Sequence, residues 1–323
     1  MRSSPAISGY ILLAGAIVLN IIVQGKSFFS ASYFSSIMSN NGPLILAAIA
    51  QTVVVLAGGI DLSVGSIMAL VNAVAIVLAN EYGWSVGGAW TAALIAGTLV
   101  GVVNGFIVAY VRVDSLLATF ATMSIVGGVG LLVLPKPGGS VPRAVYGVYH
   151  GYLLGLPAPI WIILAIVLLW ALINRYPIGR YIRAVGGNER SAYASGIRTT
   201  QVKFFAFVFS AFVTSIAGLS LTALMAAGDP RIGLPFTLNS IAAIILGGTI
   251  LSGGWGSVGG SIAGALFLAL VSNIVFYTFN FLVTAIPGFN VTTYYQQLLS
   301  NFIVIFGLAS TVLTNRRNKT AKA

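Results

Sequence analysis

Few residues in this chain could do acid–base or metal chemistry. Its 323 residues include five Asp and Glu, one His and no Cys; charged residues make up 7% and hydrophobic residues 58%. A soluble domain usually carries about 25% charge. The absence of cysteine excludes disulfides, zinc–thiolate sites and iron–sulfur clusters. The one histidine, His150, has no partner for a metal site. We therefore predict an all-α polytopic membrane protein with no metal site and no catalytic residue.

The most informative acid is Asp61, which lies between two apolar helical runs. A charged side chain costs about 2.5–3.5 kcal/mol at the centre of a membrane helix, and a break in the helix avoids that cost. Gly58 and Gly59 can end the incoming helix, and Asp61 or Ser63 can cap the outgoing one. This broken-helix motif comprises Gly58, Gly59, Asp61, Ser63, Gly65 and Ser66. It is either a tight turn at the membrane surface or a segment that lines a transport pathway.

Apolar runs recur along the whole chain. At roughly 17–25 residues per span, they predict about ten transmembrane helices in one membrane domain over residues 1–323. The expected spans lie near residues 7–23, 43–57, 66–80, 87–110, 115–134, 159–173, 204–226, 237–252, 257–280 and 296–314. The first run is too long for a signal peptide and lacks a small-residue cleavage site, so we expect a retained anchor.

Basic residues predict the orientation of these spans. If both termini are cytoplasmic, the outer segments hold only Lys26, Lys136, Arg143 and Arg231, and every other Lys and Arg lies in an inner segment. This is the positive-inside bias of membrane proteins. The net charge of +11 therefore reflects membrane orientation, and we expect no nucleic-acid partner.

Glycines recur every four residues in two of the expected helices. One set is Gly97, Gly101 and Gly105, and the other is Gly256, Gly260 and Gly264. Small residues at this spacing let helix backbones approach closely. The segments at 63–67 and 257–262 are also alike, which indicates either a distant internal duplication or chance similarity.

The longest inner loop, residues 174–203, is expected to hold a short cytoplasmic helix. Asn188 is a candidate N-cap and Glu189 suits the first turn. Gly196 can stop the helix. So short a helix is unstable alone in water, and it packs either against its own membrane domain or against a partner.

Several motifs resemble the ribose-type permease subunits of bacterial ABC sugar importers. The matching segments are GGIDLSVGS (58–66), GVVNGFIV (101–108), SLLATFATM (115–123), GRYIRAVGGNERSAYASGI (179–197) and IAAIILGGTILSGGWGSVGGSIAGAL (241–266). The resemblance extends over nearly the whole chain and keeps the order of the motifs. It implies a permease subunit in the inner membrane that translocates a monosaccharide or a similar small polyol-like solute.

The resemblance also implies partners. They are a cytoplasmic ABC ATPase, a periplasmic sugar-binding protein and either a second copy of this permease or a different one. It makes the 189–196 segment the coupling helix that seats in an ATPase groove. The coupling residues are then Asn188, Glu189, Arg190, Ala192, Tyr193 and Gly196.

The chain departs from the family pattern at two places. Thr237-Leu-Asn-Ser240 stands where members carry Glu-Leu-Asp-Ala, and Gly127-Gly128 stands where an arginine is frequent. Pairing with a different permease is one interpretation, and a shift of substrate within the sugar class is another.

The energy source must lie outside this chain. A P-loop requires Gly-x-x-x-x-Gly-Lys-Ser/Thr, which the sequence lacks. We expect no cofactor here and ATP–Mg on the ATPase; the alternative is an ion-coupled secondary transporter of a small neutral solute. Uncharged polar residues within the spans are candidates for the pathway: Gln51, Asn72, Asn104, Asn239 and Asn273, with Thr52, Thr119 and Thr122. Each of them can instead bond a neighbouring helix.

Overall fold

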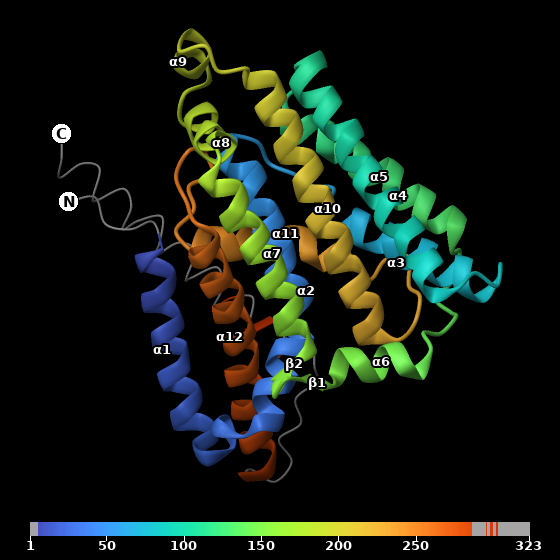
Figure 1. Ribbon diagram of the computed structural model, residues 1–323. Coiled ribbons are helices and arrows are strands. Elements are labelled where there is room, and N and C mark those ends of the chain that lie inside the picture. The colour runs from blue at the N-terminus through green and yellow to red at the C-terminus, as the bar shows by residue number, and fades with distance from the viewer. Residues whose placement is uncertain (1–5, 286–294, 296–297, 300–301, 303–323) are drawn as a thin grey trace.

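Long helices arranged in a bundle make up most of this protein (Figure 1). The computed structural model describes residues 6–285, 295, 298–299 and 302. The first half contains α1 (Ile7–Gln24), η1 (Gly25–Phe29), α2 (Ala31–Leu56), α3 (Val64–Asn80), α4 (Val86–Phe106), η2 (Ile107–Val111) and α5 (Ser115–Val133). The second half contains α6 (Arg143–His150), β1 (Tyr152–Leu153), β2 (Leu156–Pro157), α7 (Ala158–Arg175), α8 (Pro177–Gly187), α9 (Glu189–Ala194), α10 (Thr199–Met225), α11 (Leu234–Leu246) and α12 (Val258–Ala285).

The expected spans within the described residues each contain a helix. Seven helical segments are long and apolar enough to cross a membrane, and α3 and α11 are shorter apolar helices. The 13 residues of α11 extend about 20 Å, which is less than the ~30 Å hydrocarbon core of a bilayer. The expected span at 296–314 lies outside the described residues. The prediction of an all-α polytopic membrane protein is confirmed.

The second span begins earlier than predicted, because α2 passes through Pro43. Proline removes the N–H that would bond the carbonyl four residues back, here that of Ser39. The hydroxyl of Tyr149 donates to this carbonyl over 2.9 Å and replaces the missing bond. The helix starts instead at Ala31, after Ser30, whose hydroxyl accepts the N–H of Tyr33.

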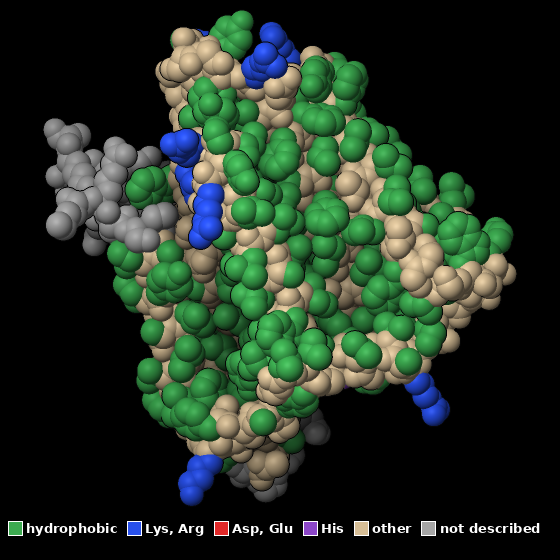
Figure 2. Space-filling model, viewed as in Figure 1, with side chains coloured by type: hydrophobic (Ala, Val, Ile, Leu, Met, Phe, Trp, Pro, Cys, Tyr) green, Lys and Arg blue, Asp and Glu red, His purple; other side chains and the backbone are tan. Residues whose placement is uncertain are grey.

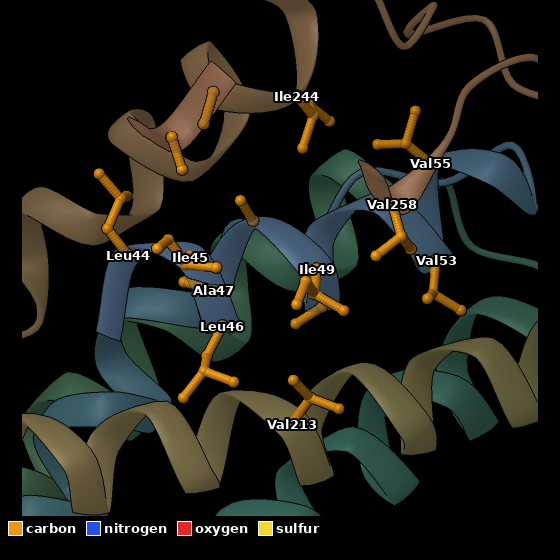
Figure 3. Close-up of a cluster of buried hydrophobic side chains, with 14 of the residues drawn as sticks. Leu44, Ile45, Leu46, Ala47, Ile49, Val53, Val55, Val213, Ile244 and Val258 are labelled. Atoms are coloured by element: carbon orange, nitrogen blue, oxygen red, sulfur yellow. The ribbon is translucent and has the colours of Figure 1, made fainter. Parts of the chain in front are cut away.

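The core of the bundle surrounds α2. In the apolar 18-residue window of its candidate span, 89% of the residues are buried, against 17% in the corresponding windows of α1 and α7 and 28% in that of α5. Its apolar side chains meet Val213 of α10, Ile244 of α11 and Val258 of α12 (Figure 3). The C-terminal half of α2 is therefore packed against α10, α11 and α12, while α1, α5 and α7 form the rim of the bundle.

The first glycine ladder lets α4 and α10 approach closely, as predicted. A Cβ at Gly101 would lie 2.2 Å from Cβ of Ala211, and one at Gly97 would lie 2.3 Å from Oγ of Ser215. The second ladder is shorter than predicted, because Gly256 precedes the start of α12. Gly260 and Gly264 do pack on α11, where a Cβ would lie 2.2 and 2.0 Å from the carbonyls of Gly247 and Ala243, respectively.

The short helix α11 lies across the bundle rather than along it (Figure 1). It is preceded by a loop, residues 226–233, that turns back against α3. The amide of Asn72 donates to the carbonyl of Ala227 and accepts the N–H of Asp229. The backbone N–H of Gly65, at the start of α3, donates to Oγ1 of Thr237. Thus α11 begins beside the start of α3 and ends beside the start of α12.

The face of the bundle seen in Figure 2 carries many apolar side chains. Lys and Arg side chains gather toward the upper end in this view, near α8 and α9, and isolated ones protrude at the lower edge. This distribution matches the segregation of basic residues that the sequence predicts.

Candidate coupling and transport site

The predicted break between two helices is present at Gly58–Ser63. Helix α2 ends at Leu56, and Gly58 takes a left-handed backbone with φ of +84°. The N–H groups of Gly58 and Gly59 donate to the carbonyls of Val55 and Val54. Left-handed backbone suits glycine because it has no Cβ. The chain then runs without regular structure until α3 begins at Val64.

Asp61 is fully buried inside this break. Its Oδ1 accepts the N–H of Ser63 over 2.8 Å and the hydroxyl of Ser63 over 2.6 Å. Gln51 of α2 bonds the backbone of Asp61 on both sides: its amide nitrogen donates to the carbonyl (3.1 Å), and its amide oxygen accepts the N–H (3.3 Å). Asp61 therefore stabilises an Asx-type turn, and Gln51 of α2 bonds the backbone of this turn.

The predicted capping of α3 by Asp61 or Ser63 is wrong. Ser63 is the N-cap residue, but its side chain accepts no bond from the helix, and Asp61 bonds Ser63 itself. The hydroxyl of Thr237 caps α3 instead, by accepting the N–H of Gly65. Gly65 leaves room for this contact, since a Cβ there would lie 2.4 Å from Oγ1 of Thr237.

Helix α5 holds the break by side chain-to-backbone bonds. The N–H of Ile60 donates to Oγ of Ser115 (3.1 Å), and the N–H of Leu62 donates to Oγ1 of Thr119 (3.0 Å). On an otherwise exposed helix, these hydroxyls satisfy backbone donors that the broken helix leaves free. Ser66 closes the segment, because its hydroxyl donates to the carbonyl of Ser63.

Helix α4 contributes one amide to the same network. Nδ2 of Asn104 donates to Oγ of Ser63 over 2.9 Å, and Oδ1 of Asn104 accepts the hydroxyl of Thr122 over 2.6 Å. A hydrogen-bonded chain thus runs from α5 through α4 to the carboxyl of Asp61. All four side chains are buried.

The residues predicted for a pathway do not meet in one place. Gln51 and Asn104 belong to the network around the break, and Asn72 holds the loop before α11. Asn273 bonds the carbonyl of Ala269 in its own helix, and Asn239 is exposed on α11. Their contact with a transported solute remains a prediction.

Sequence reasoning missed Ser115 and Thr237 as partners of the break. Ser115, Thr119 and Thr122 lie at i, i+4 and i+7, which places three hydroxyls on one face of α5. That spacing is readable in the sequence. The contact of Thr237 is not, because it joins segments more than 170 residues apart.

The short helix predicted within residues 174–203 is present as α9. Oδ1 of Asn188 accepts the N–H of Ser191 over 2.9 Å, as expected of an N-cap. Gly196 has a φ of +80° and ends the helix. Glu189 pairs with Lys203 of α10. Ala192 faces inward, while Tyr193 is 73% exposed, so α9 presents a polar and aromatic outer face.

The last turn of α8 contacts the break directly. A Cβ at Gly186 would lie 1.9 Å from the carbonyl of Leu56, the last residue of α2. The same carbonyl accepts the N–H of Gly254 over 3.2 Å. Between α9 and the break lies a cavity of about 610 Å³. Four expected inner loops therefore meet at one end of the bundle. They are the break itself, the connection before α5, the segment that contains α8 and α9, and the connection before α12.

A helical bundle with an internal helix break, next to an exposed capped helix, suits a membrane transport protein. Residues 33–308 match the family described as "Branched-chain amino acid transport system / permease component". The chain belongs to this permease family, whose members form the multi-pass inner-membrane part of transporters.

Ribose and L-arabinose permeases match the chain over most of their own length. The ribose import permease protein RbsC of Haemophilus influenzae is 33% identical over 297 residues, which cover 90% of this chain and 88% of the relative. RbsC of Escherichia coli K12 is 34% identical over 307 residues, covering 92% and 91%. The L-arabinose permease AraH of the same strain is 33% identical over 226 residues, covering 67% and 66%. No solved structure matches the chain.

Proposed function

We propose that this chain is the membrane-spanning subunit of an ATP-driven importer that carries a monosaccharide or a similar small polyol-like solute. The observation that carries the proposal is the 33–34% identity to ribose import permeases over about nine-tenths of the chain. Among the described residues, Asp61 is the one charged side chain that is buried. A neutral solute fits a bundle of this kind, because hydroxyls can be bound by neutral hydroxyl and amide groups without a buried charge.

The proposed orientation places α9, the break and both termini in the cytoplasm. Support comes from the basic residues: Arg112, Arg190 and Lys203 line the cavity at this end. The opposite end carries Lys26, Lys136 and Arg143 in the segments after α1 and α5. Among the described residues, the expected inner segments hold seven Lys and Arg, and the expected outer segments hold four, Arg231 included. This asymmetry follows the positive-inside rule.

In this proposal, α9 is the coupling helix that receives movement from a cytoplasmic ATPase. Its residues Asn188, Glu189, Arg190, Tyr193 and Gly196 are exposed. Gly186, in the last turn of α8 just before α9, touches the end of α2 backbone to backbone. Packed backbones transmit displacement because they cannot be compressed. A shift of α9 would thus reach the break without a flexible side chain between them.

The chain supplies no catalytic group in this scheme. ATP–Mg binds the ATPase, a periplasmic binding protein delivers the solute, and a second permease completes the pathway. Gly127 and Gly128 of α5 face open space, with no atom within 4 Å of a Cβ placed there. We propose α5 and the exposed face of α11 around Asn239 as the sides that meet the second permease, whether a copy or a different chain.

ATP hydrolysis by the reconstituted complex tests this assignment. We expect the ATPase to hydrolyse ATP faster when the permease, the binding protein and its pentose are all present. A permease that leaves ATP hydrolysis unchanged under these conditions would overturn the proposal. Uptake that follows an imposed proton gradient without ATP would favour an ion-coupled carrier instead.

A further inference from the structure

The cavity between α9 and the break has a charge pattern of which the proposed coupling role uses only Glu189 and Arg190 of α9. It is formed by three cations and two acids, along with hydroxyls and apolar groups. The cations are Arg112, at the end of η2, Arg190 of α9, and Lys203 of α10. Segments that are far apart in the sequence thus bring positive charge to one cavity of about 610 Å³.

Both acids of the cavity already have partners within the protein. Glu189 pairs with Lys203. Oδ1 of Asp114 accepts the N–H groups of Leu116 and Leu117 at the start of α5. Within the part of the chain that the structure describes, one ion pair is formed, and it includes neither Arg112 nor Arg190. Neither guanidinium group therefore forms an ion pair, and the charged residues that line the cavity sum to a net charge of +1.

We propose that this cavity binds a phosphate-bearing anion through Arg112 and Arg190. Guanidinium groups present a planar fork of donors that matches phosphate oxygens. Ser115, Thr199 and Thr200 add hydroxyl donors to the same lining. Arg112 also has a left-handed backbone, with φ of +65°, which is uncommon for a residue other than glycine.

The surroundings of Arg112 favour a lipid headgroup as the source of the phosphate. On the outside of α4, η2 and α5, a run of apolar side chains is exposed next to Arg112: Phe106, Tyr110, Val111, Val113, Leu116 and Leu117. An acyl chain can lie on this surface while its headgroup reaches the cavity. Basic pockets between helices on the cytoplasmic side recognise anionic headgroups in this way.

An occupied site would join α9 to the α4–α5 connection. Arg190 belongs to α9, and Arg112 lies directly before α5. A bound phosphate that contacts both would restrain the movement of α9 relative to the break. The assignment to the inner leaflet rests on the proposed orientation, whereas the anion site itself does not.

Native mass spectrometry and calorimetry test this proposal on the permease assembled with its ATPase. In the first arm, the complex is extracted from membranes and the retained phospholipid is identified. In the second arm, the complex in phosphatidylcholine nanodiscs is titrated with sodium phosphate. The variants are Arg112→Gln, Arg190→Gln and their combination. Arg180→Gln is the matched control, because Arg180 is exposed on α8 and is not among the residues that line the cavity.

We expect wild type and Arg180→Gln to retain an anionic phospholipid, and the double variant to retain about tenfold less. Arg112→Lys and Arg190→Lys should fall between, because lysine keeps the charge but loses the fork. If the loss appears in the phosphate titration alone, the site takes a soluble phosphate ester. If Arg112→Gln impairs folding, the proposal is decided by the binding that Arg190→Gln shows, because Arg190 is exposed on α9. Equal binding by wild type and the Gln variants in both arms, or no binding by wild type, overturns the proposal.

Discussion

At the residue scale, the buried carboxyl of Asp61 organises the break through one oxygen. Oδ1 accepts two bonds from Ser63, and Ser63 in turn accepts the amide of Asn104. A buried N–H or O–H that loses its partner costs about 1–3 kcal/mol. The network is therefore sensitive to the shape and the acceptor capacity of residue 61.

Substitution of Asp61 separates its acceptor role from its charge. Asp61→Asn keeps an oxygen that can accept both bonds from Ser63, and we expect a correctly folded protein with substantial uptake. Asp61→Leu removes the acceptor and leaves two buried donors unpaired, which should lower stability by about 2–5 kcal/mol. The folded yield after detergent extraction, measured by size-exclusion chromatography, checks this difference. A Leu variant as stable as the Asn variant would contradict it.

Glycines of α4 and α5 provide a matched pair for the packing argument. A Cβ at Gly101 would lie 2.2 Å from Ala211, whereas one at Gly127 meets no atom within 4 Å. Gly101→Ala should therefore destabilise by about 1–3 kcal/mol through overpacking. Gly127→Ala should be neutral or stabilising by up to about 1 kcal/mol, because alanine favours helix. Thermal unfolding of both variants in detergent measures the contrast, and equal shifts would refute the close α4–α10 contact.

At the element scale, the molecule relies on helices that stop inside the bundle. The break before α3 and the break before α12 both meet α11, which caps α3 through Thr237 and packs on Gly260 of α12. The similar segments at 63–67 and 257–262 thus have equivalent positions at the starts of α3 and α12. Irregular backbone at this depth is tolerated because protein covers it.

The C-terminal glycine of α9 allows a test of coupling. Gly196 has a left-handed backbone, which a β-branched residue adopts only with strain. Gly196→Val should displace the end of α9, leave membrane insertion intact, and abolish both uptake and the stimulation of ATP hydrolysis. Gly187→Ala is the control, because a Cβ there meets no atom within 4 Å and its φ is not positive. Normal uptake by Gly196→Val with the partners present would exclude α9 as the coupling helix.

Local elements could be predicted from the sequence, and their long-range partners could not. The break at Gly58–Ser63 and the caps of α9 follow from residue types within a few positions. The run of α2 through Pro43 could not be foreseen, because it depends on Tyr149, more than a hundred residues away. The same holds for the cap of α3 by Thr237. The candidate pathway amides could be identified as polar residues within the spans. Their hydrogen-bond partners could not, because tertiary packing brings those partners from distant segments.

At the scale of the whole molecule, the break, α9 and the cavity between them lie at one end of the bundle. The central helix α2 connects this end to the opposite one, where Tyr149 of α6 bonds its Ser39 carbonyl. The rim helices α1, α5 and α7 are the least buried of the candidate spans in the described part of the chain. This arrangement suits a subunit that meets lipid and other proteins around its edge.

Cysteine labelling tests the proposed orientation, and the natural absence of cysteine makes single replacements clean. Ser191→Cys in α9 and Lys319→Cys near the C-terminus should resist a membrane-impermeant thiol reagent in intact cells. Tyr146→Cys in α6 should react, because Tyr146 is exposed at the opposite end. Labelling after permeabilisation controls for reactivity. Labelling of Ser191→Cys from outside would contradict the proposed orientation, because α9 would then lie on the outer side of the membrane.

The most direct test of the central claim is the uptake of a labelled pentose by proteoliposomes that contain this chain, its ATPase and its binding protein. We predict uptake that requires ATP on the side of the membrane that carries the ATPase and the binding protein on the opposite side. Asp61→Asn should retain most of this uptake. Uptake that proceeds without ATP on an imposed proton gradient, together with a well-folded but inactive Asp61→Asn variant, would contradict the account and assign the chain to the ion-coupled carriers.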